Sequence, residues 1–302
     1  MPRFTTRTLF ALGAALALWA SAFAGIRAGL RAYPPAHLAI LRFLVASLLL
    51  AVYAGIAHFR RPALRDLPGL FLTGALGITY YNIAINYGET RVTAGAASLL
   101  IASVPIWTAL FARFILHEKL TSLGWFGVLL SFAGVALIAS GEGEGIHLSP
   151  QALVILSASL TSAIYMIMQK RYLGRYSALE FTAYSIWFGT LMMLPFGVGF
   201  VHTLLAAPLA ATLAVIYLGI FPGALAYVAW AYVMSHGTAG RTATLLYMIP
   251  VMAIGIAWLW LGEVPRWISL IGGLIALAGV VLVNTKGKEL PYEIGENVPE
   301  AA

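Results

Sequence analysis

The sequence predicts an all-α integral membrane protein whose ten transmembrane helices form two inverted five-helix repeats. Of its 302 residues, 61% are hydrophobic and only 10% are charged, and the mean hydropathy is +0.89. A soluble domain carries about 25% charged residues, and its surface needs polar cover that this chain cannot supply. Two further observations, the spacing of apolar stretches and an internal repeat, support the same fold class.

Composition also excludes several kinds of function. A soluble enzyme, a disordered chain and a secreted disulfide-rich domain are all incompatible with this apolar content. The chain contains no cysteine, which removes disulfides, thiol catalysis and cysteine-ligated metals together. The net charge of +7 would suggest nucleic acid in a soluble protein. In a membrane protein the basic bias of cytoplasmic loops explains it, so we expect no nucleic-acid partner.

Ten apolar stretches are long enough to cross a hydrocarbon core of about 30 Å, which takes about 20 helical residues. They cover Thr8–Ile26, Ala36–Ala57, Leu67–Tyr87, Thr93–Leu116, Leu123–Ser140, Gln151–Met168, Phe181–Phe200, Pro208–Met234, Ala239–Leu261 and Ile268–Asn284. A signal peptide cleaved near Ala24 is the alternative for the first stretch. Cleavage there would leave nine spans and spoil the repeat described below.

The distribution of basic residues predicts that both termini are cytoplasmic. With the N-terminus inside, the inside segments carry 13 Lys and Arg residues and the outside segments carry four. Cytoplasmic loops are enriched in basic residues, so this topology is favoured over its inverse. It makes residues 286–302 a polar cytoplasmic tail.

The internal repeat is the most specific signal in the chain. At an ungapped offset of 145, residues 93–137 match residues 238–282 at 14 of 45 positions. Pro105 aligns with Pro250, and Glu118 aligns with Glu263. Chance matching within an apolar alphabet does not explain such agreement at one offset. We therefore expect one five-helix repeat in residues 1–145 and a second in residues 146–285.

The repeat has a mechanistic consequence. Because five is odd, the second repeat must enter the membrane from the opposite side. Inverted repeats are characteristic of transporters that work by alternating access, with a substrate site near the midplane between the repeats. Pro105 and Pro250 fall near the middle of the fourth and ninth spans, where proline kinks a helix. We interpret them as candidate hinges, with a fixed bend as the alternative.

With these features the chain resembles the drug/metabolite transporter superfamily, specifically its ten-helix EamA-type exporters. The resemblance is carried by Leu18-Trp19-Ala20-Ser21, Arg42-Phe43, and the series Pro105, Glu118, Gly127 and Gly134 with its counterpart Pro250, Glu263, Gly272 and Gly279. The YddG-type aromatic amino acid exporters are similar members. The resemblance implies a multi-pass exporter of amino acids or similar metabolites in a bacterial-type plasma (inner) membrane. It is specific for the family but weak for the substrate.

Aromatic and polar residues gather in the spans that would line a central cavity. An aromatic cavity with few polar groups suits a largely apolar or aromatic solute. A buried amide such as Asn82 must face protein or a cavity rather than lipid. For any one of these side chains, packing between helices is the alternative. The candidate substrate-binding residues are Trp19, Tyr80, Asn82, Ser98, Ala102, Tyr165, Tyr227, Trp230 and Tyr247.

Ionisable residues are scarce within the spans. All eleven Asp and Glu residues fall in loops, in the tail or in the last turn of a span. The sequence therefore predicts transport without a buried carboxylate that relays ions, and leaves Glu89 as the remaining candidate for such a group. Arg42 is the only basic residue well inside a span. We interpret it as a gate or as a contact for a substrate carboxylate, with a structural role as the alternative.

We therefore predict a secondary transporter, not an enzyme, that exports small metabolites, with amino acids as the first choice. An exporter of drugs or organic cations is the alternative within this class, and an integral membrane enzyme is the alternative from another class. The six His residues lack metal-ligand spacing, and nucleotide-binding and hydrolase motifs are absent from the sequence. We expect no metal or cofactor, and a monomer rather than a homodimer in the lipid bilayer.

Overall fold

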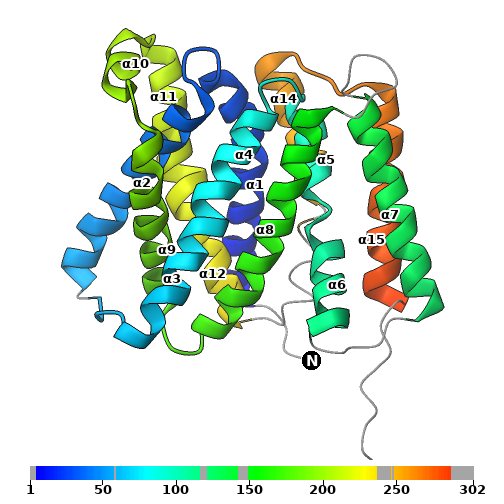
Figure 1. Cartoon of the computed structure of the whole chain (residues 1–302), viewed down its shortest axis with the longest axis horizontal. Coiled ribbons are helices and arrows are strands. Elements are labelled where there is room, and N and C mark those ends of the chain that lie inside the picture. The colour runs from blue at the N-terminus through cyan, green and yellow to red at the C-terminus, as the bar shows by residue number, and fades with distance from the viewer. Residues whose placement is uncertain are drawn as a thin grey trace, which may run out of the picture.

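The computed structural model describes residues 5–57, 59–115, 121–141, 149–236, 246 and 248–286, and within these ranges every regular element is helical (Figure 1). In chain order the elements are α1 (Thr6–Gly29), α2 (Pro35–Ala57), η1 (Leu64–Asp66), α3 (Leu67–Thr73), η2 (Gly74–Tyr80), α4 (Tyr81–Gly88), α5 (Ala94–Ile101), α6 (Val104–Ile115), α7 (Ser122–Gly141), α8 (Pro150–Tyr172), α9 (Ala178–Met193), η3 (Leu194–Phe196), α10 (Phe200–Ala206), α11 (Leu209–Leu218), η4 (Gly219–Leu225), α12 (Ala226–His236), α14 (Met248–Leu261) and α15 (Trp267–Lys286). The predicted tail lies outside the described residues, apart from its first residue.

The outer surface of the helix bundle is apolar. Leu48, Leu129 and Leu274, on three different helices, expose 68%, 67% and 70% of their surface. A surface of this kind belongs in lipid, so the protein is a multi-pass membrane protein. Four described segments are long and apolar enough to span a membrane alone: Thr6–Gly29, Pro35–Ala57, Pro150–Tyr172 and Leu209–Ser235. Other apolar helices are shorter or bent, so the count of ten spans stays a prediction.

The first helices of the two repeats run in opposite directions. Near the end of α1, Arg27 donates from Nη1 to the backbone carbonyl of Glu89 at 2.7 Å. A Cβ on Gly88 would lie 3.1 Å from the carbonyl oxygen of Gln151, in the first turn of α8. The end of α1 and the start of α8 therefore meet at the same end of the bundle. We call this the distal end, marked by Arg27, Glu89 and Gln151, and the opposite end the proximal end.

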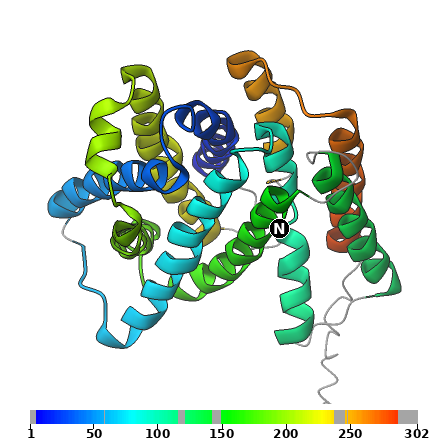
Figure 2. The same ribbon diagram turned by 45° about the horizontal axis from the view of Figure 1, so that its top comes forward.

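The last helices of the two repeats, α7 and α15, pack along their length at one side of the molecule (Figures 1 and 2). Glycines make this contact possible. A Cβ on Gly134 would lie 2.4 Å from the backbone nitrogen of Ala276, and one on Gly279 would lie 2.5 Å from the carbonyl oxygen of Gly127. The glycines that recur in the sequence repeat therefore allow direct backbone contact between equivalent helices.

Two π-helical segments occupy equivalent positions in the repeats. The segments η2 and η4 begin at Gly74 and Gly219, which differ by the repeat offset of 145. Each packs on a helix of the other repeat. A Cβ on Gly74 would lie 2.7 Å from the nitrogen of Gly189 in α9, and one on Gly219 would lie 2.5 Å from the carbonyl oxygen of Arg42 in α2. π-Helical turns are rare and are frequent at functional sites.

The predicted span Phe181–Phe200 is too long. The helical segment that begins with α9 ends at η3, and α10 follows at an angle of 92° to it. Pro195 lies inside η3, and Gly199 has φ of 78°, a conformation that favours glycine. Phe200 is therefore the first residue of α10 and not the last residue of a span.

The predicted fourth span is interrupted in its middle. The helix α5 ends at Ile101, and α6 begins at Val104, directly before Pro105. Proline fits at a helix start because the backbone N–H that it lacks has no intrahelical partner there. Pro105 therefore lies at a helix start within the predicted fourth span. Pro250 is the third described residue of α14.

Candidate functional site

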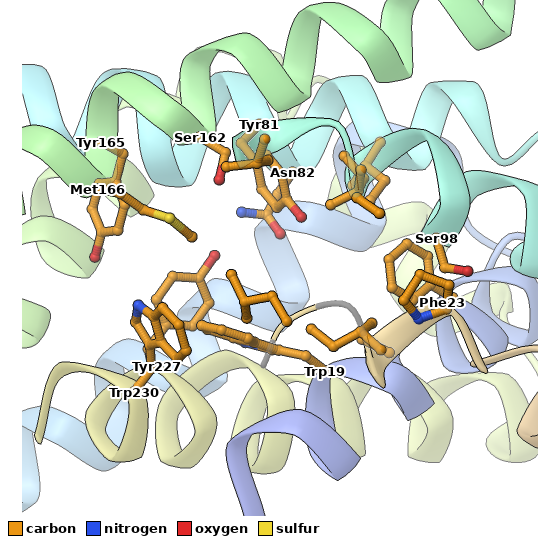
Figure 3. Close-up of a pocket in the computed structure, with 18 of the residues that line it drawn as sticks. Trp19, Phe23, Tyr81, Asn82, Ser98, Ser162, Tyr165, Met166, Tyr227 and Trp230 are labelled. Carbon is orange, nitrogen blue, oxygen red and sulfur yellow. The ribbon is translucent and has the colours of Figure 1, made fainter. Parts of the chain in front are cut away.

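A cavity lies between the two repeats, with an empty volume of about 870 Å³ when the space at its open side is included (Figure 3). Helices of both repeats contribute to it, including α1, α4, α8 and α12. The predicted site residues that line it are Trp19, Arg42, Asn82, Ser98, Ala102, Pro105, Tyr165, Tyr227, Trp230 and Pro250.

Two of the predicted substrate-binding residues are not placed in the cavity. Tyr80 is 43% exposed, and its hydroxyl lies 2.8 Å from Oγ of Ser157, away from the lining. The next residue, Tyr81, lines the cavity instead. Tyr80 ends a π-helical segment, so its direction does not follow from the α-helical period on which sequence reasoning relies. Tyr247 lies outside the described residues, as does Glu118.

Sequence reasoning missed several lining residues. Phe23 follows Trp19 by one helical turn, and Ser162 and Met166 flank Tyr165 on α8. Helical spacing from the predicted residues was the signal that could have found them, because residues three or four apart share a face.

The aromatic side of the cavity is built around Trp19 of α1. Its ring lies edge-on to Tyr227 with centroids 5.5 Å apart, and tilted against Trp230 with centroids 5.3 Å apart. Tyr165 of α8 lies with its ring centroid 6.4 Å from that of Tyr227. The indole Nε1 of Trp230 is buried and makes no hydrogen bond to any part of the chain that the structure describes. This side therefore offers large apolar faces together with the indole donor of Trp230.

The π-helical segments place a matched pair of polar side chains at the cavity. Asn82 and Tyr227 are the second residues of α4 and α12, directly after η2 and η4, and both line the cavity. Nδ2 of Asn82 donates to the carbonyl of Ile78 at 2.8 Å, which fixes the amide. The Tyr227 hydroxyl points toward the Asn82 side chain (Figure 3). Polar groups of the two repeats thus meet at the centre of the molecule.

Arg42 supplies positive charge to this otherwise apolar cavity. It lies on α2, is 3% exposed, and its guanidinium carbon is 5.2 Å from the centroid of the adjacent Phe43 ring. Its Nε is buried, and no described residue accepts a hydrogen bond from it. Among the residues that the structure describes, no carboxylate forms an ion pair with it, and none lines the cavity. A buried guanidinium without a counter-ion favours an anionic ligand group.

An ion pair joins the repeats at the distal end. Nη2 of Arg27 lies 2.9 Å from Oε1 of Glu263, and Nε donates to the same oxygen at 3.0 Å. Gly262, with φ of 69°, ends α14, and the N–H of Glu263 donates to the carbonyl of Ala257. This Schellman-type cap turns the chain so that Glu263 reaches Arg27 and the start of α5. We call this contact the distal ion pair.

A second ion pair joins the repeats at the proximal end. Nη1 of Arg175 lies 2.6 Å from Oδ1 of Asp66, and the hydroxyl of Tyr176 donates to Oδ2 at 2.9 Å. Asp66 precedes α3 in the first repeat, and Arg175 follows α8 in the second. We call this contact the proximal ion pair. The central cavity is therefore flanked at both ends by a charged link between the repeats.

Glu89 is the carboxylate that the sequence left as a candidate for binding ions. Glu89, directly after α4, is completely buried. It lies at the distal end rather than among the cavity residues. Among the described residues, no group of three His, Asp or Glu side chains is arranged to hold a metal ion.

An apolar helical bundle with two inverted repeats around a central cavity is the architecture of a membrane transporter. The comparison with protein families agrees: the EamA-like transporter family matches residues 6–140 and again residues 149–285. The chain belongs to this family.

Curated relatives are similar over nearly their full length. The uncharacterized transporter YdfC of Bacillus subtilis is 40% identical over 286 residues, 95% of this chain and 94% of the relative. A probable terminal-alkyne amino-acid exporter of Streptantibioticus cattleyicolor is 39% identical over 281 residues, 93% of this chain and 94% of the relative. The uncharacterized inner membrane transporter YedA of Escherichia coli K12 is 28% identical over 288 residues, 93% and 91% of the two chains.

A solved crystal structure of a protein with 20% sequence identity superposes with a TM-score of 0.62. The match covers 92% of this chain and 96% of that chain. This likeness supports the fold alone.

Proposed function

We propose that the protein exports amino acids, aromatic ones included, through the central cavity by alternating access. The proposal includes ten membrane spans, cytoplasmic termini, a monomeric state and no enzymatic activity. The observation that carries it is the buried Arg42 guanidinium, which has no carboxylate partner among the described residues and faces an aromatic cavity. The similarity to a relative named a probable terminal-alkyne amino-acid exporter supports the same substrate class.

The cavity suits each part of an amino acid. A substrate carboxylate would pair with Arg42, whose planar guanidinium can donate two parallel hydrogen bonds. An ammonium group would find the faces of Trp19 and Trp230, together with the Asn82 amide and the Tyr227 hydroxyl. An aromatic side chain would stack against the same indole rings.

Alternating access would use the two ion pairs as gates. Each one joins the first repeat to the second, so breaking it lets the repeats separate at that end only. The helix boundary before Pro105 and the π-helical segments are the places where the chain can bend without breaking a long helix. Opening the two ends in turn carries the substrate across.

Counterflow and uptake in proteoliposomes test the proposal directly. We expect uptake of aromatic amino acids by the wild-type protein, reduced at least tenfold by Arg42→Gln and less by Arg42→Lys, which keeps the charge. The matched control is Arg31→Gln, because Arg31 is exposed at the distal end. Flux of an organic cation with no flux of any amino acid would replace the proposal with the drug-exporter alternative. Equal transport by wild type and Arg42→Gln would remove Arg42 from substrate recognition.

A further inference from the structure

Glu89 differs from the other carboxylates that the structure describes. Asp66, Glu180 and Glu263 each accept hydrogen bonds. Glu89 is 0% exposed, and neither of its carboxylate oxygens has a hydrogen-bond partner among the residues that the structure describes. An ionised carboxylate is strongly disfavoured in such a place, because burial removes its hydration and nothing replaces it.

The charged groups around Glu89 do not compensate for this burial. Arg27 of α1 donates to the backbone carbonyl of Glu89, but its Nε and Nη2 are directed to Glu263. Arg42 of α2 also acts on Glu89 electrostatically, but among the described residues the two form no ion pair. Burial raises the pKa of Glu89 well above its ordinary value and is the largest effect. The positive charges of Arg27 and Arg42 lower this pKa, and the negative charge of Glu263 raises it.

The other elements that pack here add no charge. The helix α5 and the first turns of α8 contain no ionisable residue. A small polar hollow at the distal end is lined by Arg27, Leu30, Arg31, Thr90 and Glu263. It reaches the distal ion pair but not the Glu89 side chain. Separation of Arg27 from Glu263 would therefore extend this hollow toward Glu89.

We propose that Glu89 is a proton-binding site whose occupancy controls closure of the distal end. In the closed arrangement one carboxylate oxygen carries a hydrogen, so no bare anion is buried. When the distal ion pair separates, water reaches Glu89, the O–H bond breaks, the proton leaves to that water and the carboxylate is hydrated. The ligand of this site is a single proton. The inference rests on the alternating-access part of the proposed function and not on the substrate class.

The sign and size of the pH dependence follow from this step. Closure takes up one proton, so the ratio of closed to open protein falls tenfold for each unit of pH between the ordinary pKa of a glutamate, about 4.3, and the raised pKa of Glu89 in the closed arrangement. Acidic conditions favour closure of the distal end, and that preference is lost as the pH rises through the raised pKa.

Distance measurements between two spin labels test the site without any substrate. The chain has no cysteine, so Arg91→Cys with Val264→Cys places labels only on two exposed positions at the distal end. We expect the long-distance population in wild-type nanodiscs to grow with rising pH, and to stay small at every pH in Glu89→Gln. Glu89→Leu, whose side chain suits an apolar interior, must likewise show a long-distance population that does not change with pH. A size-exclusion profile shows which variants are folded.

The variant Glu263→Gln, which removes the distal ion pair, distinguishes the contribution of Glu263 to the pH response from that of Glu89. Without the Glu263 charge, Arg27 acts on Glu89 alone, so we expect the midpoint of the pH response to move to lower pH. The inference is overturned if the distance distribution of the wild-type protein does not change with pH. It is also overturned if both Glu89 variants are folded and still show the pH dependence of the wild-type protein. If pH controls the distance as described while no amino acid is transported, the proton site stands and the proposed substrate class falls.

Discussion

The segments η2 and η4 occupy the same position in the two repeats but are held in different ways. In η2, Oγ1 of Thr79 donates to the carbonyl of Gly189 in α9 at 2.8 Å. In η4, Pro222 lies inside the segment and has no N–H to donate. There, a Cβ on Gly223 would lie 3.6 Å from Nε of Arg42 in α2. One segment is fastened by a side-chain hydrogen bond, and the other by close packing alone.

The difference shows how an approximately symmetric frame can carry an asymmetric site. The helix that supports η4 carries Arg42, and the equivalent position on α9, 145 residues later, is Trp187. A guanidinium thus stands in one half where an indole stands in the other. We infer that η2 is the firmer attachment between the repeats, and that a movement at η4 changes the position of the cavity's positive charge.

The largest expected effect comes from filling the close contacts that both segments share. Gly74→Val and Gly219→Val would each place a side chain against backbone atoms of the other repeat. Since backbone cannot rotate away, we expect each to lower the free energy of unfolding by about 3 kcal/mol. Thermal unfolding in detergent measures this. Gly255→Val is the control, because a Cβ there meets nothing within 4 Å. A loss at only one glycine would show that the segments are not equivalent in packing.

A smaller effect is expected from the polar residues that the two segments direct into the cavity. Asn82→Leu removes the amide from a buried position, and we expect uptake of an aromatic amino acid to fall about tenfold, the value of one lost hydrogen bond of about 1.4 kcal/mol. Tyr227→Phe keeps the ring that packs on Trp19, so we expect a fall of only a few-fold. Initial uptake rates in proteoliposomes give both values. Tyr80→Phe, outside the cavity, should leave uptake unchanged.

The sequence predicted a two-repeat architecture and nearly half of the residues that line the cavity, because both depend on residue type and helical period. Trp19, Asn82 and Tyr227 could be found as large or polar groups inside apolar spans. The direction of Tyr80 could not be found, since a π-helical turn shifts the period by about one residue per turn. The burial of Glu89 could not be found either, because a carboxylate at a span end is normally hydrated, and its burial here depends on tertiary packing around the end of α4.

The bond that fastens η2 should be worth less than either of these changes. Thr79→Val is nearly isosteric but leaves the carbonyl of Gly189 without its side-chain donor. Hydrogen bonds between membrane helices contribute about 0.6 kcal/mol on average, so we expect a loss of stability of that order. Unfolding in a denaturing detergent series measures it. Thr79→Ser retains the hydroxyl and should behave as wild type. Equal stability of all three proteins would contradict the view that η2 is the firmer attachment.

The proline of η4 gives the smallest expected change in stability. Pro222→Ala supplies an N–H and removes the ring that opposes regular α-helix, so the segment can tighten toward α-helical geometry. We expect the free energy of unfolding to change by less than about 0.5 kcal/mol, since an added hydrogen bond offsets the greater freedom of the unfolded chain. Uptake should nevertheless slow several-fold, because the position of Arg42 follows η4. Pro208→Ala, directly before α11, is the matched control. Unchanged uptake in Pro222→Ala would mean that η4 does not control the cavity's charge, and the two segments would then differ in how they are held but not in what they do.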